Sequence, residues 1–217
     1  MSRLYATLGL RVTWLYVLGT VLMVCVVVLG SAAQESDSVT SDGWRRAIAG
    51  YKLQFPLDHG SHPDYRIEWW YYTGNLASDD GRRFGYQVTF FRIGVDPDPE
   101  NPSRWAVRDL FMTHFAVTDI GDGNHRIAER INRGGVGWAG ARVGTLDVWN
   151  GDWRVKIDDQ QHQLRLVERQ FGVDLRLEPG KGITLHAGDG FSRKGSEVGN
   201  ASYYYSMTRM PTSGSLT

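Results

Sequence analysis

The spacing of turns after residue 50 is the feature that most constrains the fold. Glycine, aspartate and asparagine recur between short runs in which apolar and polar residues alternate. Alternation with a period of two is the pattern of half-buried β-strands, and no stretch after residue 50 keeps the periodicity of a helix. We therefore predict an all-β chain of roughly eight to ten short antiparallel strands. A barrel is favoured over a sandwich, because closure leaves no exposed strand edge.

Individual strands follow from the same alternation. They are predicted at residues 67–73, 83–93, 105–118, 125–132, 163–169, 172–177 and 203–209, with two further pieces inside 145–158. Asp79-Asp80-Gly81 predicts a tight hairpin turn between the first two strands. The segment 96–103 carries three prolines and is expected to be a loop. A short helical turn is predicted at 44–49, where it would close one end of the barrel.

The first 33 residues are predicted to direct export. Arg3 and Arg11 flank the start of an apolar run from Val12 to Gly30, and the small residues Ser31-Ala32-Ala33 follow it as a cleavage site would. The alternative is that this run of 19 residues stays attached as a membrane anchor. The protein is thus expected in the periplasm, either free or anchored through residues 12–30.

Composition argues against several function classes. The single cysteine, Cys25, lies within the apolar run, so the exported chain would need neither a disulfide nor a thiolate nucleophile. Beyond residue 33 the chain has 22 basic against 24 acidic residues, a formal charge of about −2, which does not favour binding of nucleic acid. A polar leader is predicted at 34–50, disordered at its start, and a β domain at 51–217.

The stretch from Phe55 to Leu76, FPLDHGSHPDYRIEWWYYTGNL, carries the most unusual chemistry. Its first part is predicted to be a polar turn, because glycine and proline interrupt regular structure there. Its second part is expected to be a strand, on which Glu68, Trp70 and Tyr72 share one side while Trp69 faces the other. A carboxylate among aromatic rings suggests the wall of a ligand cavity.

This stretch resembles the signature of the AttH-like, lipocalin-like secreted proteins. The resemblance rests on Phe55-Pro56, Asp58-His59-Gly60, His62-Pro63, Glu68-Trp69-Trp70-Tyr71 and Thr73-Gly74-Asn75-Leu76. The family includes the bacterial carotenoid 1,2-hydratases (hydroxyneurosporene synthases) and is often labelled "predicted secreted hydrolase"; fungal pericyclases are more distant relatives. The resemblance implies a lipocalin-like antiparallel β-barrel. It also implies that residues 51–217 are the first of two similar domains, truncated at the C-terminal end.

Glu68 is the first catalytic candidate. Burial among aromatic rings would raise the pKa of its carboxyl group toward the range of a general acid. Protonation of an alkene would create a carbocation, which tryptophan and tyrosine faces can stabilise. The favoured alternative is structural: Glu68 pairs with an arginine such as Arg92 and closes the barrel.

His114 is the second catalytic candidate. It lies mid-strand in Thr113-His114-Phe115-Ala116, and the family resemblance extends to this strand. Its functional role would be to orient a ligand hydroxyl or a water molecule. The alternative is a core histidine whose hydrogen bonds are satisfied within the protein.

Aromatic side chains supply the predicted ligand contacts, since their faces suit an apolar molecule and phenols add hydrogen-bond donors. The candidates are Trp69, Trp70, Tyr72, Tyr86, Tyr203, Tyr204 and Tyr205. The expected partner is a hydrophobic small molecule of isoprenoid, carotenoid-like or lipid type. Two functions stay open: a cofactor-free hydratase or isomerase, and a non-enzymatic carrier or envelope-associated binding protein.

Metal and serine-nucleophile sites find little support in the sequence. His59 and His62, with Asp58 and Asp64 beside them, could hold a divalent metal. No third ligand is identifiable by spacing, so no metal is predicted, and the alternative is hydrogen bonding within the loop. No Gly-x-Ser-x-Gly motif is present, so the hydrolase label has no visible nucleophile.

Overall fold

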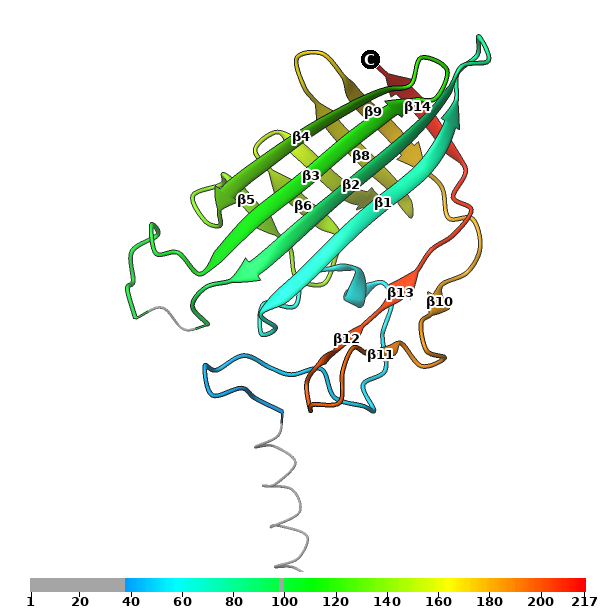
Figure 1. Cartoon of the computed structure of the whole chain (residues 1–217). Helices are drawn as coiled ribbons and strands as arrows, with labels where there is room; N and C mark the ends of the chain where they lie inside the picture. Colours follow the sequence, from blue (N-terminus) through cyan, green and yellow to red (C-terminus); the bar gives the residue numbers. More distant parts are fainter. Residues whose placement is uncertain (1–37, 98–99) are drawn as a thin grey trace, which may run out of the picture.

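The computed structural model describes residues 38–97 and 100–217, and its regular structure is almost entirely β (Figure 1). One four-stranded antiparallel sheet has the order β1-β2-β3-β4. Its strands are β1 (Ile67–Ala77), β2 (Arg83–Gly94), β3 (Asp109–Asp119) and β4 (Asn124–Arg133). A one-turn 3-10 helix, η1 (Leu57–His59), precedes β1.

A second antiparallel sheet faces the first and has the order β14-β9-β8-β7-β6-β5. Its strands are β5 (Ala139–Ala141), β6 (Asp147–Asn150), β7 (Trp153–Asp158), β8 (Gln161–Val167), β9 (Gly172–Leu177) and β14 (Thr212–Leu216). Two small ribbons join β10 (Thr184–Leu185) to β13 (Tyr205–Ser206) and β11 (Phe191–Arg193) to β12 (Ala201–Tyr203). Among the described strands no ladder joins the two large sheets, so they form two facing layers.

Apolar side chains from both layers fill one part of the space between them. Phe115 on β3 packs against Trp153 on β7 and Phe171, with ring centroids 5.7 and 5.1 Å apart. Val88 and Phe90 of β2 are fully buried in the same cluster. Removal of this apolar surface from water is the main stabilising contribution to the fold.

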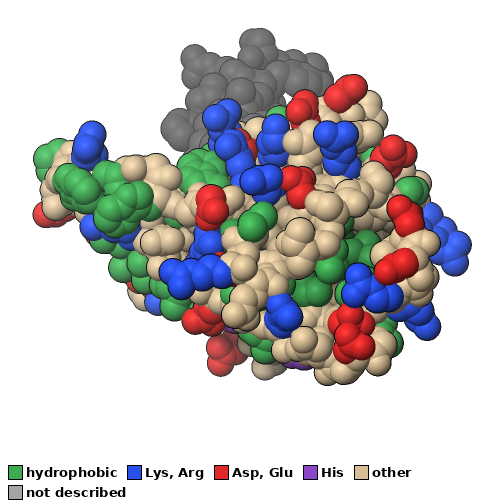
Figure 2. All heavy atoms as spheres, turned by 90° about the horizontal axis from the view of Figure 1, so that it is seen from above, with side chains coloured by type: hydrophobic (Ala, Val, Ile, Leu, Met, Phe, Trp, Pro, Cys, Tyr) green, Lys and Arg blue, Asp and Glu red, His purple; other side chains and the backbone are tan. Residues whose placement is uncertain are grey.

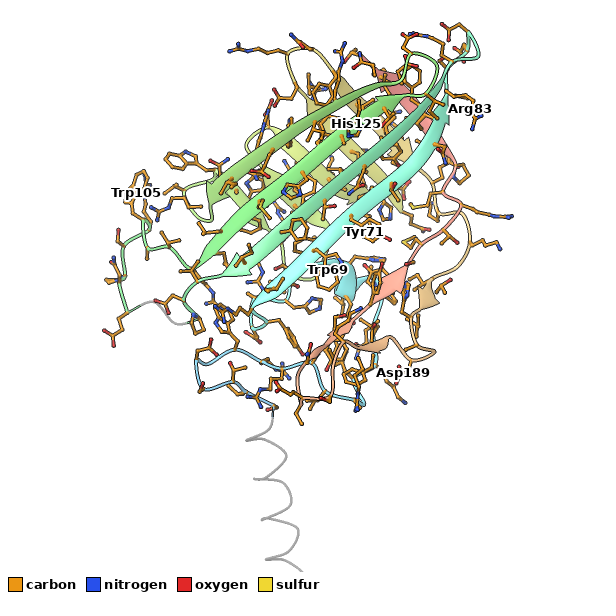
Figure 3. All side chains as sticks on the ribbon, in the orientation of Figure 1. Trp69, Tyr71, Arg83, Trp105, His125 and Asp189 are labelled. Carbon is orange, nitrogen blue, oxygen red and sulfur yellow. The ribbon has the colours of Figure 1, made fainter. Side chains whose placement is uncertain are left out.

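The all-β, antiparallel prediction is confirmed, and most strands lie within a few residues of their predicted positions, although no ladder closes a barrel among the described strands. The third strand begins at Asp109, four residues later than predicted. Residues before it form a turn, in which the Ala106 amide donates to the Ser103 carbonyl, and the Arg108 carbonyl accepts from Val95. Trp105 therefore lies in a loop that projects from the sheet (Figure 3).

The helical turn predicted at 44–49 was wrong, because this segment is extended. Single β-bridges pair Arg45 with Tyr65 and Ala47 with Gly199. Trp44 is almost fully buried, and a Cβ atom at Gly94 would lie 2.2 Å from its ring. The segment is therefore held by packing against the end of β2, which only glycine at position 94 permits.

The predicted export segment, residues 1–33, lies outside the described residues. The start of the predicted polar leader, residues 34–37, also lies outside them, and residues 38–50 pack against the β domain. In the described part of the chain, no helix has the length and apolar character needed to span a membrane. Figure 2 shows acidic and basic side chains interspersed on the face viewed from above, with no continuous area of one sign.

Candidate functional site

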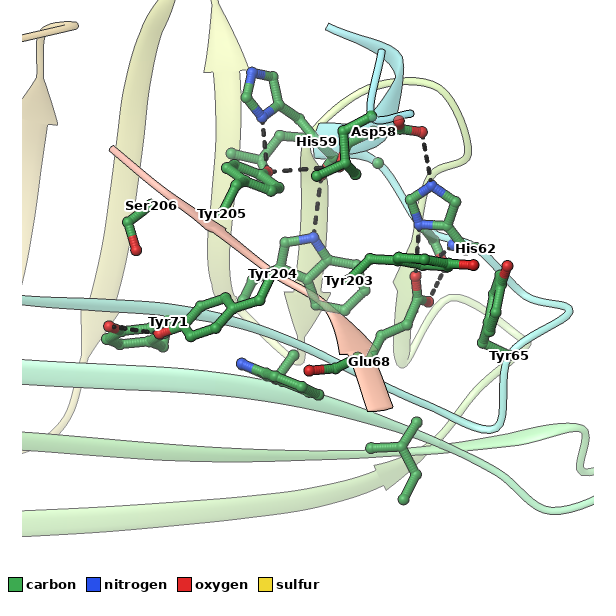
Figure 4. Close-up of a pocket in the computed structure, with 18 of the residues that line it drawn as sticks. Asp58, His59, His62, Tyr65, Glu68, Tyr71, Tyr203, Tyr204, Tyr205 and Ser206 are labelled. Carbon is green, nitrogen blue, oxygen red and sulfur yellow. Dashed lines mark hydrogen bonds and ion pairs between the residues drawn. The ribbon is translucent and has the colours of Figure 1, made fainter. Parts of the chain in front are cut away.

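A cavity of about 1150 Å³ lies at the edge of the first sheet, around β1. Most of its lining comes from four parts of the chain, namely β1, the turn around η1, the N-terminal segment 40–53 and the segment 201–212, and Tyr86 of β2 and His162 of β8 also line it. Both faces of β1 contribute, because β1 is an edge strand and the cavity can extend to either side of it. The close-up in Figure 4 shows histidine, tyrosine and carboxylate side chains converging there.

All the predicted ligand contacts line this cavity, namely Trp69, Trp70, Tyr72, Tyr86, Tyr203, Tyr204 and Tyr205. Trp70 and Tyr72 belong to the inner face, with Trp70 at the margin of the core. Tyr86 reaches the cavity from β2, because a Cβ at Gly74 would lie 2.7 Å from its ring and glycine leaves that space open. Their role in binding a ligand remains a prediction.

Three consecutive tyrosines, which we call the tyrosine strap (residues 203–205), fasten one wall of the cavity to three different elements. The Tyr203 hydroxyl donates to the Ile48 carbonyl at 2.8 Å. The Tyr204 hydroxyl lies 3.2 Å from that of Tyr71, on the same side of β1 as Trp69 (Figure 3). The Tyr205 hydroxyl lies 2.8 Å from Nδ1 of His59 (Figure 4).

Glu68 lies at the centre of a network of ionised groups. Its Oε1 accepts from the backbone amide and Nδ1 of His62 at 2.6 and 2.9 Å. Its Oε2 accepts from the Ser61 hydroxyl at 2.8 Å and from Nε of Arg92 at 2.7 Å. Nε2 of His62 in turn lies 3.0 Å from Oδ1 of Asp58. Both nitrogens of His62 therefore face carboxylates.

These contacts reverse the pKa shift expected for Glu68. Burial alone would raise the pKa of its carboxyl group, but the hydrogen bond from His62 and the charge of Arg92 outweigh burial and lower it. The guanidinium of Arg92 is almost fully buried and also donates to Asp109 at 2.6 Å. Glu68 is thus an ionised partner of Arg92, as the structural alternative predicted. The prediction that its pKa is raised, as a general acid requires, was wrong.

The same network predicts how stability depends on pH. The hydrogen bonds that the His62 ring donates to Glu68 and Asp58 raise the pKa of His62, and hydrogen bonds lower the pKa values of both carboxyl groups despite their burial. Because the pKa of His62 is raised, its stabilising contribution is fully present below the ordinary histidine value of 6.5, and this contribution is lost as pH rises through the folded-state pKa. Because the pKa of Glu68 is lowered, its stabilising contribution is present above the ordinary glutamate value of 4.5, and this contribution is lost on acidification.

We therefore expect the network to contribute most between pH 4.5 and 6.5. Urea unfolding midpoints measured across pH should fall on both sides of that window. In His62→Gln the decline on the alkaline side should be weaker, because the imidazolium is gone. If the midpoint of the variant fell as steeply above pH 6.5 as that of the wild type, the assignment of a charged His62 would be contradicted.

His114 differs from both expectations for it. It lies on the face of β3 opposite the buried Thr113 and Phe115, and its side chain is 43% exposed. Its Nε2 lies 2.8 Å from Oε2 of Glu129, a residue of β4. His114 does not line the cavity, so it is neither a buried core histidine nor placed to orient a ligand there.

A second pair of histidines, His59 and His162, lies inside the cavity wall. Both are buried, and their rings are 6.2 Å apart at 73°. Nδ1 of His162 lies 2.7 Å from the Tyr72 hydroxyl. Burial lowers the pKa of both histidines, to about 4 for His162, whose pKa the neighbouring His59 lowers further. Both imidazoles are therefore neutral near pH 7.

His162 was missed by the sequence analysis, although the sequence contained a signal for it. His162, Leu164 and Leu166 alternate with the polar Gln163 and Arg165, so the histidine shares an apolar strand face. A titratable group on such a face is either satisfied by a buried partner or part of a site. Its partner, Tyr72, lies 90 positions away and could not be identified from local pattern.

Three of the four ring nitrogens of His59 and His62 already have hydrogen-bond partners. Asp58 and Glu68 occupy both ring nitrogens of His62, and Tyr205 occupies Nδ1 of His59. Over residues 38–97 and 100–217, no cluster of three or more His, Cys, Asp or Glu side chains is arranged to hold a metal ion. The turn instead fixes the position of η1 against β1.

Comparisons with known proteins agree with this architecture. The model of the family described as AttH-like matches residues 46–217. A crystal structure from Nitrosomonas europaea described as an AttH is 34% identical, with a TM-score of 0.70, covering 79% of this chain and 51% of that one. Kievitone hydratase from Nectria haematococca shares the fold at 13% identity, with a TM-score of 0.53, covering 83% of this chain and 50% of that one.

The chain therefore spans about half the length of both solved structures. Among curated proteins, none matches the sequence at a significant level.

Proposed function

Because this chain belongs to the AttH-like family, we propose that it binds an apolar isoprenoid-like or lipid molecule in the cavity around β1 and acts on it as a cofactor-free hydratase or isomerase. The observation that carries the proposal is the cavity itself. Its volume of about 1150 Å³ is slightly larger than that of ordinary ligand pockets. Tryptophan and tyrosine rings from β1 and the tyrosine strap form much of its wall.

The choice of an apolar ligand follows from this lining. Aromatic faces gain free energy when an apolar molecule displaces water from them. The charged groups that line the same cavity are largely paired with one another, as Glu68 is with Arg92 and His62. They are therefore poorly placed to bind a highly charged ligand near Glu68.

An enzymatic role is supported by the family and by the buried neutral histidines. The fold is shared with kievitone hydratase, a protein named for hydration. At 13% identity this similarity supports the fold alone. The competing function is a carrier that returns its ligand unchanged. We further propose that the protein is exported, with residues 12–30 as a cleaved signal or an anchor, and that it works with a second β domain.

Binding can be tested with the apolar fluorophore N-phenyl-1-naphthylamine. We expect its fluorescence to rise on addition of the protein. Trp69→Ala should weaken binding about tenfold, since a ring of the cavity wall is lost. Trp105→Ala is the matched control, because that ring is exposed on a loop outside the cavity lining and its loss should leave affinity unchanged.

Mass spectrometry of the purified protein should also detect a bound polyene or lipid. Incubation with lycopene, an acyclic carotenoid, separates the functions: a hydratase adds the mass of water, an isomerase changes the chromatographic retention time at the same mass, and a carrier releases lycopene unchanged. Absence of both fluorophore binding and a co-purified apolar molecule would refute the proposal.

A further inference from the structure

A serine and a histidine that the proposed function does not use are in hydrogen-bond contact at the wall of the cavity. Oγ of Ser206 lies 2.7 Å from Nε2 of His186. Ser206 lines the cavity, and Figure 4 shows its hydroxyl among the lining side chains. Both residues are half-buried, so neither is enclosed in the core. A hydroxyl within hydrogen-bond distance of an imidazole is the arrangement by which enzymes activate a serine.

The ribbon of β10 and β13 sets this contact. Its register pairs Thr184 with Ser206, and the His186 amide donates to the Tyr204 carbonyl at 3.0 Å. The histidine and the serine therefore lie on adjacent extended segments, although 20 positions separate them in the chain. The pair has no Gly-x-Ser-x-Gly motif around it, so only the folded structure reveals it.

Tyr204 holds the imidazole of His186 in its orientation. The two rings are stacked, with centroids 3.8 Å apart and planes that differ by 6°. Rotation of the imidazole would break this stacking, so Nε2 stays directed at Ser206. Among residues 38–97 and 100–217 no carboxylate contacts the His186 ring. Stacking therefore takes the place of the carboxylate that orients the histidine of a catalytic triad, and slow turnover is expected.

Two phenol hydroxyls lie in the same part of the cavity. Tyr204, whose ring contacts His186, places its hydroxyl 3.2 Å from that of Tyr71, and both tyrosines line the cavity. Figure 4 shows these hydroxyls and that of Ser206 in one region. They can donate to an oxygen that becomes negative. The ring of Trp69, 6.2 Å from that of Tyr204, adds an apolar surface beside them.

We propose that Ser206 and His186 form a nucleophile–base pair that hydrolyses esters of an apolar carboxylic acid. This activity goes beyond the proposed function, although it uses the same cavity. The apolar acyl chain lies against the aromatic wall near Trp69, and the ester carbonyl lies at Ser206. An ester is a better substrate than an amide, because its leaving group departs more readily and no carboxylate assists the histidine.

The reaction needs only water as a further reagent. In the tautomer with its hydrogen on Nδ1, His186 takes the Ser206 proton at Nε2 while Oγ bonds to the carbonyl carbon. The C=O electron pair moves onto the oxygen, where phenol hydroxyls stabilise it. When the carbonyl re-forms, the C–O bond to the alcohol breaks, and the alcohol leaves with the proton from His186. Water then cleaves the acyl-serine by the same steps, which releases the carboxylic acid and restores the pair.

A fluorophosphonate probe tests the nucleophile directly. The full chain should form a covalent adduct, and mass spectrometry of its peptides should place the adduct on Ser206. Ser206→Ala and His186→Gln should both lose labelling, the second because the hydroxyl is no longer activated. Ser192→Ala is the matched control. The Ser192 hydroxyl accepts from Lys194 at 3.0 Å and lies outside the cavity lining, so labelling should be unchanged.

Hydrolysis of p-nitrophenyl octanoate measures turnover. We expect Ser206→Ala to abolish hydrolysis above the uncatalysed rate and His186→Gln to lower kcat about 100-fold, since a general base is lost. Ser192→Ala should keep the wild-type kcat. Binding of N-phenyl-1-naphthylamine by each variant shows that the variant is folded.

An adduct on any residue other than Ser206, or undiminished hydrolysis in Ser206→Ala, would overturn the inference. A protein that binds N-phenyl-1-naphthylamine but is neither labelled nor active on the ester would also overturn it and leave the proposed function intact. Labelling of Ser206 and ester hydrolysis by a protein that binds no apolar probe would instead support the pair and count against the proposed function.

Discussion

Replacing Glu68 with Gln is expected to lower the free energy of unfolding by about 3–5 kcal/mol, the usual loss when one partner of a buried ion pair is removed. The amide has no charge to offset Arg92, whose guanidinium is 2% exposed, or the imidazolium of His62. Urea unfolding followed by tryptophan fluorescence measures the change. Loss of the network should also loosen the turn around η1, because Ser61 and His62 bond to this carboxylate.

Glu129→Gln is the matched control for this prediction. Glu129 also faces a histidine, His114, but its side chain is 53% exposed. An exposed pair contributes at most about 1 kcal/mol, so unfolding should change little. If both variants were equally stable, the buried network around Glu68 would not be a main contributor to the fold.

Trp153→Ala should destabilise the protein by about 3–5 kcal/mol, because it leaves a large cavity in the packed part of the core. Trp153 is fully buried, its ring contacts Phe115, and its indole donates to the Val167 carbonyl at 3.2 Å. Thermal unfolding and urea unfolding should both report the loss. The ligand cavity lies around β1, so the folded variant should still bind N-phenyl-1-naphthylamine.

Trp105→Ala provides the comparison at an exposed tryptophan. Trp105 is 49% exposed, and its ring lies 5.9 Å from that of Trp138 and 5.8 Å from the guanidinium carbon of Arg133 at the end of β4. Its removal should change stability by no more than about 1 kcal/mol. A loss as large as that of Trp153→Ala would show that this loop is integral to the core.

Much of the fold could be predicted because alternation and turn chemistry are local. The turn at Asp79-Asp80-Gly81 also sets the register of the first hairpin, in which Ala77 pairs with Arg83 and Glu68 pairs with Arg92. Counting outward from the turn thus identifies the cross-strand partner of Glu68. The direction of its pKa shift could not be predicted, since that depends on how the preceding turn folds back to bring in His62.

Other features depend on contacts between distant parts of the chain. Residues 44–49 suggest a helical turn by composition, but Trp44 is buried against Gly94 and the segment is extended. Alternation along β3 separates His114 from Thr113 and Phe115, but which of the two faces is buried is decided only when the second sheet packs against the first. For the same reason Tyr72 and His162 meet only when the two sheets face each other.

The position of the tyrosine strap has a consequence for self-association. β1 is 11 residues long and has a hydrogen-bonded neighbour strand on one side only. Bare strand edges of that length recruit other chains and nucleate aggregates. Tyr204 lies against Trp69 and Tyr71 of this strand, and its ring hinders the approach of another chain. Residues that wall a ligand site would thereby also keep the protein from polymerising through β1.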